Sequence, residues 1–138
     1  MELKSTAFRA IWQPAALAAR AALQDAGLFP HPVQEALLGC ARQAGLGPNV
    51  ARQAAVRAGL PESIPAFTVN QACASSLQAL ILAARAIALG EAELLLVGGM
   101  ESMSRVPFLL ERARTGYRLG HAELTDAMYR DGFLCPLS

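Results

Sequence analysis

The chain has 138 residues, of which 54% are hydrophobic and 17% are charged, and its formal net charge at pH 7 is +1. This length is enough for one domain with a core of its own but not for two. The small charge gives no electrostatic basis for binding nucleic acid or an anionic membrane, no apolar run is long enough to span a membrane, and nothing resembles a signal peptide. We therefore expect a cytoplasmic protein with no nucleic-acid or membrane partner, while an organellar location stays open.

The cysteine content narrows the class of protein further. Cys40, Cys73 and Cys135 are too few, and odd in number, for a disulfide framework, which favours a reducing compartment. No cysteines and histidines occur at the spacing of a zinc site, so we expect no metal.

Two segments of the first half predict helices. Residues 14–26 are mostly alanine; Pro14 suits the first helical position, and Gly27 can adopt the left-handed conformation that ends a helix. Residues 49–58 predict a second helix, for which Asn49 is a good N-cap.

Three short apolar segments are candidates for strands. Residues 66–69 are strand-like, and the continuous apolar run at 94–97 is typical of a strand that is covered on both faces, as in a parallel sheet. Residues 33–40 contain helix formers but are short and reach Gly39 near their end, so a helix and a strand both stay open. Helices that alternate with short strands predict an α/β layered fold with a parallel or mixed sheet.

The longest apolar pattern predicts a third helix over residues 72–89, with Asn70 as its N-cap and Cys73 in its first turn. This helix is apolar on nearly every side, so we expect it to be buried on most sides. The positive end of a helix dipole favours a thiolate, which makes Cys73 a candidate nucleophile. The alternative is a small buried cysteine that starts a core helix.

The chain becomes more polar near its end. Residues 100–107 are typical of a loop, and charged residues are frequent from Glu111 onward. We expect a surface excursion there, with one short helix near residues 123–130.

The residues around Cys73 resemble a known family. Residues 69–77, Val-Asn-Gln-Ala-Cys-Ala-Ser-Ser-Leu, are similar to the nucleophile signature of the thiolases, the family of acetyl-CoA acetyltransferase and 3-ketoacyl-CoA thiolase. Four further segments match in the family's order: residues 43–54, 59–61, 65–68 and 98–104. The resemblance covers roughly residues 15–138.

The resemblance implies the N-terminal half of a two-fold repeated fold of the βαβαβαββ type. The family begins with a strand that lies centrally in its sheet, and residues 1–13 lack the β-branched residues of that strand, so we expect an incomplete half-fold without it. Residues 1–110 would be a partial N-terminal domain, and residues 111–138 the truncated start of the family's loop domain.

The resemblance also implies a chemistry. Cys73 would take an acyl group from coenzyme A as a thioester, with its own backbone N–H as an oxyanion donor. The acyl group would then pass to a carbanion of acetyl-CoA or to free coenzyme A, so that a 3-ketoacyl-CoA is formed or cleaved. Coenzyme A and acetyl-CoA would be substrates, and we expect no permanently bound cofactor.

Several motifs of the family are absent from these residues: the Gly-His-Pro histidine, the Asn-Glu-Ala-Phe oxyanion segment and the second cysteine. Because one half-fold cannot cover the apolar third helix, we expect a homo-oligomer or a complementing C-terminal half as partner. Two alternatives stay open. One is a catalytically incompetent fragment or interaction module, and the other is a ketosynthase-like condensing enzyme, although residues 98–104 favour thiolase.

The remaining chemically active residues are less suited to catalysis. His31 and His121 lie in predicted turns and are expected to be solvated, and Cys135 has no visible group that would lower its pKa. Four other residues are expected to have structural and not catalytic roles. Cys40 is expected to lie in the core, and Glu101 to be hydrogen-bonded to backbone. Ser75 and Ser76 are expected to bond to backbone or to pack near the helix start.

Overall fold

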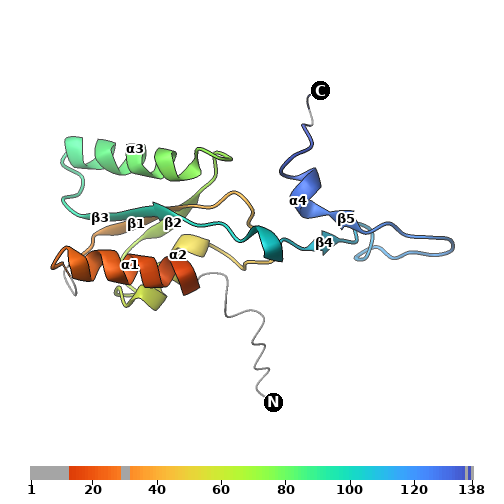
Figure 1. The fold of residues 1–138 in the computed structure, drawn as a ribbon, viewed down its shortest axis with the longest axis horizontal. Coiled ribbons are helices and arrows are strands. Elements are labelled where there is room, and N and C mark those ends of the chain that lie inside the picture. Colours follow the sequence, from red (N-terminus) through yellow and green to blue (C-terminus); the bar gives the residue numbers. More distant parts are fainter. Residues whose placement is uncertain (1–12, 29–31, 136, 138) are drawn as a thin grey trace, which may run out of the picture.

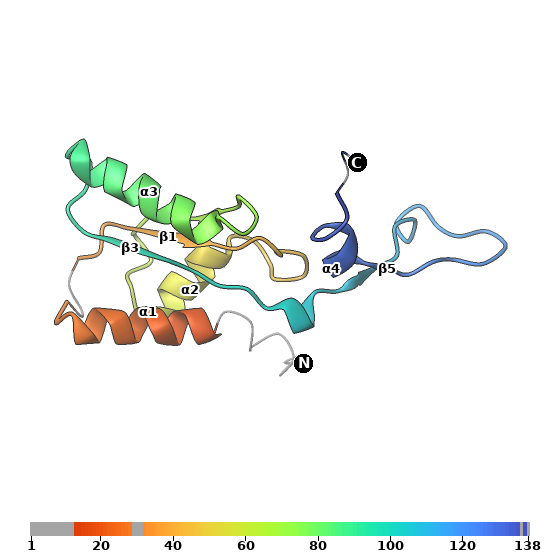
Figure 2. The same ribbon diagram turned by 45° about the horizontal axis from the view of Figure 1, so that its top comes forward.

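The computed structural model describes residues 13–28, 32–135 and 137. Its main body has three layers, in which a parallel sheet lies between two helices on one face and one helix on the other (Figures 1 and 2). The strands are β1 (Glu35–Gly39), β2 (Ala66–Val69) and β3 (Leu95–Gly99). The helices α1 (Gln13–Asp25) and α2 (Val50–Ala58) cover one face, and α3 (Ser75–Ala88) covers the other. The predicted α/β class is confirmed.

Strand β1 lies at the centre of the sheet and pairs in parallel with β2 and β3. Its register with β3 runs from Glu35 opposite Leu95 to Gly39 opposite Gly99 without interruption. No other strand therefore lies between β1 and β3, although the thiolase resemblance implies a strand at the centre of the sheet. The prediction about that first strand concerns residues 1–13, which fall almost wholly outside the described residues.

The ambiguous segment at residues 33–40 forms β1. Ala36 and Leu38 pack toward α1 and α2, whereas Leu37 packs toward α3. This alternation buries both faces of the strand, and hydrogen bonds to strands on both sides satisfy its backbone. Tertiary pairing thus overrides the local preference of the helix formers in this segment.

The helices predicted at residues 14–26 and 49–58 are confirmed as α1 and α2. Asn49 caps α2 as predicted, because its side chain accepts a hydrogen bond from the backbone N–H of Arg52 at 3.1 Å. Gly59 ends the helix with a φ of +98°.

The start of α3 differs from the prediction. The helix begins at Ser75, and Ala74 is its N-cap residue. Ala72 has a φ of +48°, which a right-handed helix cannot accommodate. The expectation that the helix begins at Ala72, with Asn70 as its cap and Cys73 in its first turn, is therefore wrong; a turn precedes the helix.

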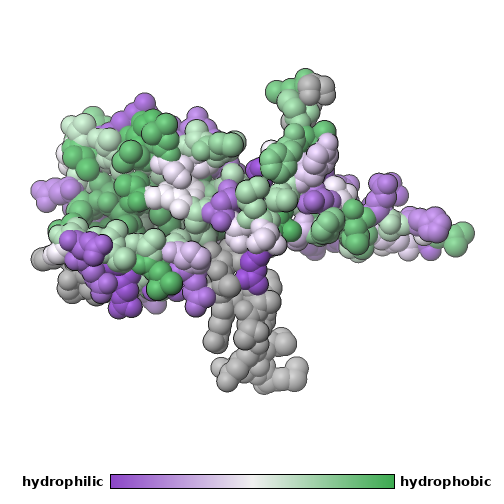
Figure 3. Space-filling model, in the orientation of Figure 1, coloured by the Kyte–Doolittle hydropathy of each residue, from purple (hydrophilic) through white to green (hydrophobic). Residues whose placement is uncertain are grey.

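The described chain by itself buries only one side of α3, so the expected burial on most sides would need a further polypeptide over its outer side. The buried residues of α3 are small: Ser75, Ala79 and Ala83. The large apolar residues of its outer side are more than half exposed: Leu77, Leu80 and Ile87. One sheet covers only one side of a helix, so apolar residues gather on the surface over α3 and the sheet beneath it (Figure 3). Despite this apolar character, neither α3 nor any other helix in the described ranges is long and apolar enough to cross a membrane.

The last part of the described chain extends away from the three-layered body (Figures 1 and 2). It contains a 3₁₀ helix, η2 (Met103–Arg105), two antiparallel two-residue strands, β4 (Phe108–Leu109) and β5 (Thr125–Asp126), and helix α4 (Ala127–Arg130). Helix α4 confirms the short helix predicted near residues 123–130. The loop between β4 and β5 is almost entirely exposed.

Candidate active site

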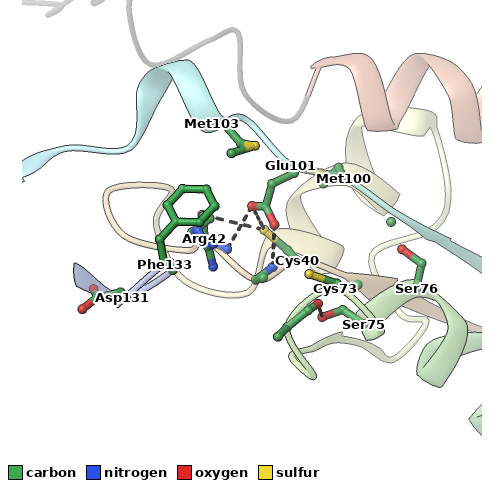
Figure 4. A pocket seen from close by; sticks show the side chains of 15 residues that line it. Cys40, Arg42, Cys73, Ser75, Ser76, Met100, Glu101, Met103, Asp131 and Phe133 are labelled. Atoms are coloured by element: carbon green, nitrogen blue, oxygen red, sulfur yellow. Dashed lines mark hydrogen bonds between the residues drawn. The ribbon is translucent and has the colours of Figure 1, made fainter. Parts of the chain in front are cut away.

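A cavity of about 520 Å³ opens at the carboxyl ends of β1 and β3, beside the start of α3. Ligands of parallel α/β sheets bind at the carboxyl ends of the strands, so this is the expected place for a functional site. Cys73 and Cys40 both line the cavity (Figure 4). Its walls also include residues that follow β1, β3 and α4: Arg42, Met100, Glu101, Met103, Asp131 and Phe133.

Two glycines allow α3 to approach the strand ends closely. Gly39 and Gly99 end β1 and β3 and lie opposite each other in the register. A Cβ atom on Gly39 would lie 2.5 Å from the backbone nitrogen of Ser76, and one on Gly99 would overlap the Ser76 hydroxyl. Only glycine fits at these two positions, so the first turn of α3 rests directly on the sheet.

Cys73 lies in a tight turn between β2 and α3, two residues before the helix begins. Asn70 Oδ1 accepts a hydrogen bond from the Ala72 N–H at 3.1 Å. Ser75 Oγ accepts one from the Gln71 N–H at 2.9 Å and donates to the Ala72 carbonyl at 2.6 Å. These bonds fix the turn and confirm that Ser75 bonds to backbone. The turn leaves the Cys73 thiol exposed on the cavity wall.

Three backbone N–H groups around the start of α3 have no hydrogen-bond acceptor among the described residues. They belong to Cys73, Ser76 and Leu77. Unpaired N–H groups at a helix start carry the positive end of its dipole and stabilise negative charge. Cys73 and Ser76 line the cavity, so these donors can stabilise an anion that forms at Cys73 or on a group bound to it.

Cys40 is the buried thiol of the same cavity. Its side chain is 1% exposed and donates a hydrogen bond to Glu101 Oε1 at 3.6 Å. Burial, followed by the nearby Glu101 carboxylate, raises the pKa of the Cys40 thiol to about 12. Cys40 therefore stays protonated at neutral pH and is not a nucleophile there. Its predicted place in the core is confirmed, but the sequence did not indicate that it lines the cavity.

Glu101 connects the segments that follow β3 and β1. Its carboxylate accepts hydrogen bonds from the backbone N–H groups of Ala41 at 3.0 Å and Arg42 at 2.9 Å. The prediction that this carboxylate bonds to backbone is confirmed. The contact holds the two strand ends together at the mouth of the cavity.

Neither of the two histidines of the sequence is placed at Cys73 by the described structure. His121 is exposed and lines a different cavity, within the loop between β4 and β5, and His31 lies outside the described residues. Cys135 is exposed and is not among the residues that line the cavity. In the described part of the chain, no three His, Cys, Asp or Glu side chains are grouped as a metal site.

Sequence reasoning missed Arg42 and Phe133. The Arg42 guanidinium lies 5.6 Å from the centre of the Phe133 ring, and both line the cavity. Arg42 follows β1, so the rule that sites form at the carboxyl ends of parallel strands could have found it. No sequence signal places Phe133, which follows α4, against the end of β1.

Comparison with known proteins identifies the family. Residues 4–137 match the family model described as thiolase, N-terminal domain. The chain belongs to the thiolase family, and the match to its N-terminal domain includes Cys73 in the turn before α3.

Its curated relatives include three bacterial proteins named acetyl-CoA acetyltransferase. The chain is 48% identical over 117 residues to the protein of Cupriavidus necator (85% of this chain, 30% of the relative). It is 50% identical over 113 residues to that of Pseudomonas aeruginosa (82% and 29%), and 46% over 117 residues to that of Escherichia coli (84% and 30%). The chain thus spans about 30% of the length of these relatives.

Proposed function

We propose that this chain carries the nucleophile of a thiolase-type acyl-CoA acyltransferase, and that Cys73 is the acyl acceptor. The observation that supports this most directly is the position of Cys73: it is the exposed thiol of a cavity at the strand ends, in front of the unpaired N–H groups of α3. The names of the relatives supply the substrate class, acetyl-CoA.

The proposed first step is thioester exchange. The Cys73 thiolate attacks the carbonyl carbon of an acyl-CoA, and the carbonyl oxygen becomes an oxyanion near the N–H groups of Cys73 and Ser76. The bond from carbon to the sulfur of coenzyme A then breaks, and coenzyme A leaves as a thiolate that takes up a proton. One thioester replaces another at nearly equal energy, so the acyl group can move in either direction.

The second step returns the acyl group to coenzyme A or joins it to a carbanion of acetyl-CoA. Either route needs a base near Cys73. No histidine of the described residues lines the cavity, and Cys40 is held in the protonated state by burial and Glu101. We propose that a second polypeptide segment, either a complementing thiolase C-terminal half or another copy of the chain, supplies this base.

The surface over α3 supports the same proposal. Leu77, Leu80 and Ile87 are exposed by 59%, 54% and 51%, and monomeric soluble proteins rarely expose such contiguous apolar residues. This observation also favours the second candidate function, an interaction module that is inactive alone. We further propose a boundary near residue 110 between the partial N-terminal domain and the start of the loop domain.

The test is acylation of the 138-residue chain by acetyl-CoA, followed by intact mass and peptide mapping. We expect one acetyl group on Cys73, none on the chain with Cys73→Ala, and unchanged uptake in Cys135→Ala, which removes another exposed thiol. If Cys73 takes up no acetyl group, the chain alone is not an acyl acceptor and the interaction-module function is favoured.

A further inference from the structure

Among the described residues that line the cavity of Cys73, one side chain is cationic, and no described residue pairs with it. Among the lining residues only Arg42 is positively charged, whereas Glu101 and Asp131 are negatively charged. No salt bridge or hydrogen bond of the described residues uses the Arg42 guanidinium, and its Nε is buried without an acceptor. Most buried polar groups of native proteins have partners. The buried Nε is out of reach of a ligand, so the terminal nitrogens of Arg42, which are not among the buried atoms without a partner, are the donors that a ligand in the cavity could use.

Packing holds the Arg42 guanidinium in place. The Phe133 ring lies 5.6 Å from it, and a Cβ atom on Gly132 would collide with it, so the guanidinium lies against the bare backbone of this glycine. Glu101 fixes the Arg42 main chain through the N–H bond of 2.9 Å. The cation is therefore positioned without a charged partner, which is an arrangement suited to binding an anion.

The two acidic groups of the cavity do not satisfy this cation. The Glu101 carboxylate accepts hydrogen bonds from two backbone N–H groups and the Cys40 thiol. Asp131 Oδ1 accepts a hydrogen bond from Arg130 Nε at 3.1 Å. Both carboxylates are thus engaged elsewhere, which leaves the Arg42 guanidinium available to a ligand.

The position of Arg42 relative to Cys73 restricts which anion it can bind. Figure 4 shows Cys40 and Glu101 between Arg42 and Cys73, and a sphere of the cavity's volume is roughly 10 Å across, at the small end of ligand sites. The phosphates of coenzyme A are separated from its thioester by the whole pantetheine arm. A carboxylate at the far end of a short acyl group is close enough to the thioester to share this cavity.

We infer that Arg42 favours, among acyl groups of equal length, those that carry a terminal carboxylate, so that monothioesters of short dicarboxylic acids are acyl donors of this chain in addition to acetyl-CoA. This inference rests on the proposed acyl transfer to Cys73. The acyl carbonyl is attacked by Cys73 while the terminal carboxylate accepts two hydrogen bonds from the guanidinium, and the leaving group is again coenzyme A. A fatty acyl chain of the same length leaves the guanidinium unpaired.

The test compares succinyl-CoA with butyryl-CoA, whose acyl groups have the same length and end in a carboxylate and a methyl group. We expect succinyl transfer to Cys73 to be about tenfold faster in the native chain, as for a hydrogen bond to a charged group. Arg42→Gln removes this preference, and Arg42→Lys, which keeps the charge, retains part of it. Arg85→Gln, on the exposed side of α3, changes net charge equally and keeps the preference.

Two results would overturn the inference: equal rates for both thioesters in the native chain, or an undiminished preference in Arg42→Gln. Slowing of both thioesters equally by Arg42→Gln would assign Arg42 to coenzyme A phosphates instead. If Arg42→Gln does not fold, the Arg42→Lys variant tests the inference, because a lysine cannot donate the paired hydrogen bonds of a guanidinium and must therefore reduce the preference for succinyl-CoA.

A second measurement separates this inference from the proposed function. 4-Iodobutyrate and 4-iodobutyramide alkylate Cys73 with loss of iodide and without acyl transfer. They differ in the charge of their terminal group, which lies four bonds from the sulfur, as the terminal carboxylate does in a succinyl thioester. We expect Arg42→Gln to lower the ratio of the 4-iodobutyrate rate to the 4-iodobutyramide rate at Cys73 severalfold. If no acyl-CoA reacts but this ratio falls, the proposed function fails and the anion site stands. If acetyl-CoA acylates Cys73 and the ratio is unchanged, the function stands and the anion site fails.

Discussion

The two sides of one cavity hold thiols of opposite character. At the end of β1, Cys40 is buried beside a carboxylate, and its pKa is raised to about 12. At the start of α3, Cys73 is exposed beside unpaired backbone donors. The residue type is the same and the strand-end location is shared, so the difference comes from burial and from the charge of the nearest group. The reactivity of each thiol is therefore set by its immediate surroundings, and these differ between two walls of the same cavity.

The largest expected effect is the reactivity contrast itself. With a pKa of about 12, Cys40 is a thiolate in roughly 10⁻⁴ to 10⁻⁵ of molecules at pH 7.5. We expect iodoacetamide to modify Cys73 at least about a thousandfold faster than Cys40, measured by peptide mapping in a Cys135→Ala background. Comparable rates at the two thiols would remove the basis of the comparison.

The next test concerns the close contact between the strand ends and the first turn of α3. Gly39→Ala would place a Cβ atom against the backbone of Ser75 and Ser76, so we expect a loss of about 3 kcal/mol in the free energy of unfolding. Gly99→Ala collides instead with the Ser76 side chain, so Ser76→Gly should restore the stability of Gly99→Ala but not that of Gly39→Ala. Urea denaturation measures all four variants. Equal rescue of both would show that α3 does not rest on these glycines.

A third test makes Cys40 more like Cys73. Glu101→Gln removes the negative charge that helps raise the Cys40 pKa, so the pKa falls and the thiolate becomes more populated. We expect Cys40 alkylation at pH 9 to accelerate about tenfold, which corresponds to one pKa unit, while Cys73 alkylation stays the same. Burial is the larger cause of the shift, so Cys40 remains the slower thiol. An unchanged Cys40 rate would mean that the carboxylate does not influence the thiol.

The smallest expected effect is on stability at high pH. The pKa of Cys40 is higher in the folded chain, about 12, than the ordinary value of 9.0. Its contribution is therefore complete below pH 9 and is lost as pH rises toward 12. Between pH 9 and pH 10 we expect the native chain to lose about 1 kcal/mol more than Cys40→Ala, measured by urea denaturation at each pH. Parallel losses in the two chains would contradict the raised pKa.

The sequence predicted the elements whose signals are local. Pro14 lies in the first turn of α1, Gly27 follows its end with a φ of +67°, and Asn49 caps α2 as expected. The strand at residues 33–40 could not be separated from a helix, because pairing with two neighbouring strands decides it. The predicted start of α3 was wrong. Ala72 has a good helix propensity, but the hydrogen bond from its N–H to Asn70 holds it in a turn with a positive φ.

The candidate site was predictable in part. Motif resemblance singled out Cys73, and the backbone role of Glu101 was anticipated. The strand-end rule could have grouped Cys40 and Arg42 with Cys73, since these residues follow β1 and β2. The contact between Phe133 and Arg42 joins distant parts of the chain, and no local pattern encodes such a contact.

The direct pairing of β1 with β3 also has a kinetic meaning. The two strands are neighbours in the sheet, but Glu35 and its partner Leu95 are about 60 residues apart in the chain, and pairings of such long separation form late because loop closure must precede them. The β1–α2–β2 unit can assemble from closer segments. Glu101 reaches Ala41 and Arg42 only after β3 has docked on β1. Cys40 packs against Leu46 and Val50 of the β1–α2 unit, so the burial that is the larger cause of its raised pKa belongs to this unit, whereas the contribution of Glu101 waits for β3. The rate of Cys40 alkylation is therefore expected to fall in two stages as the chain folds.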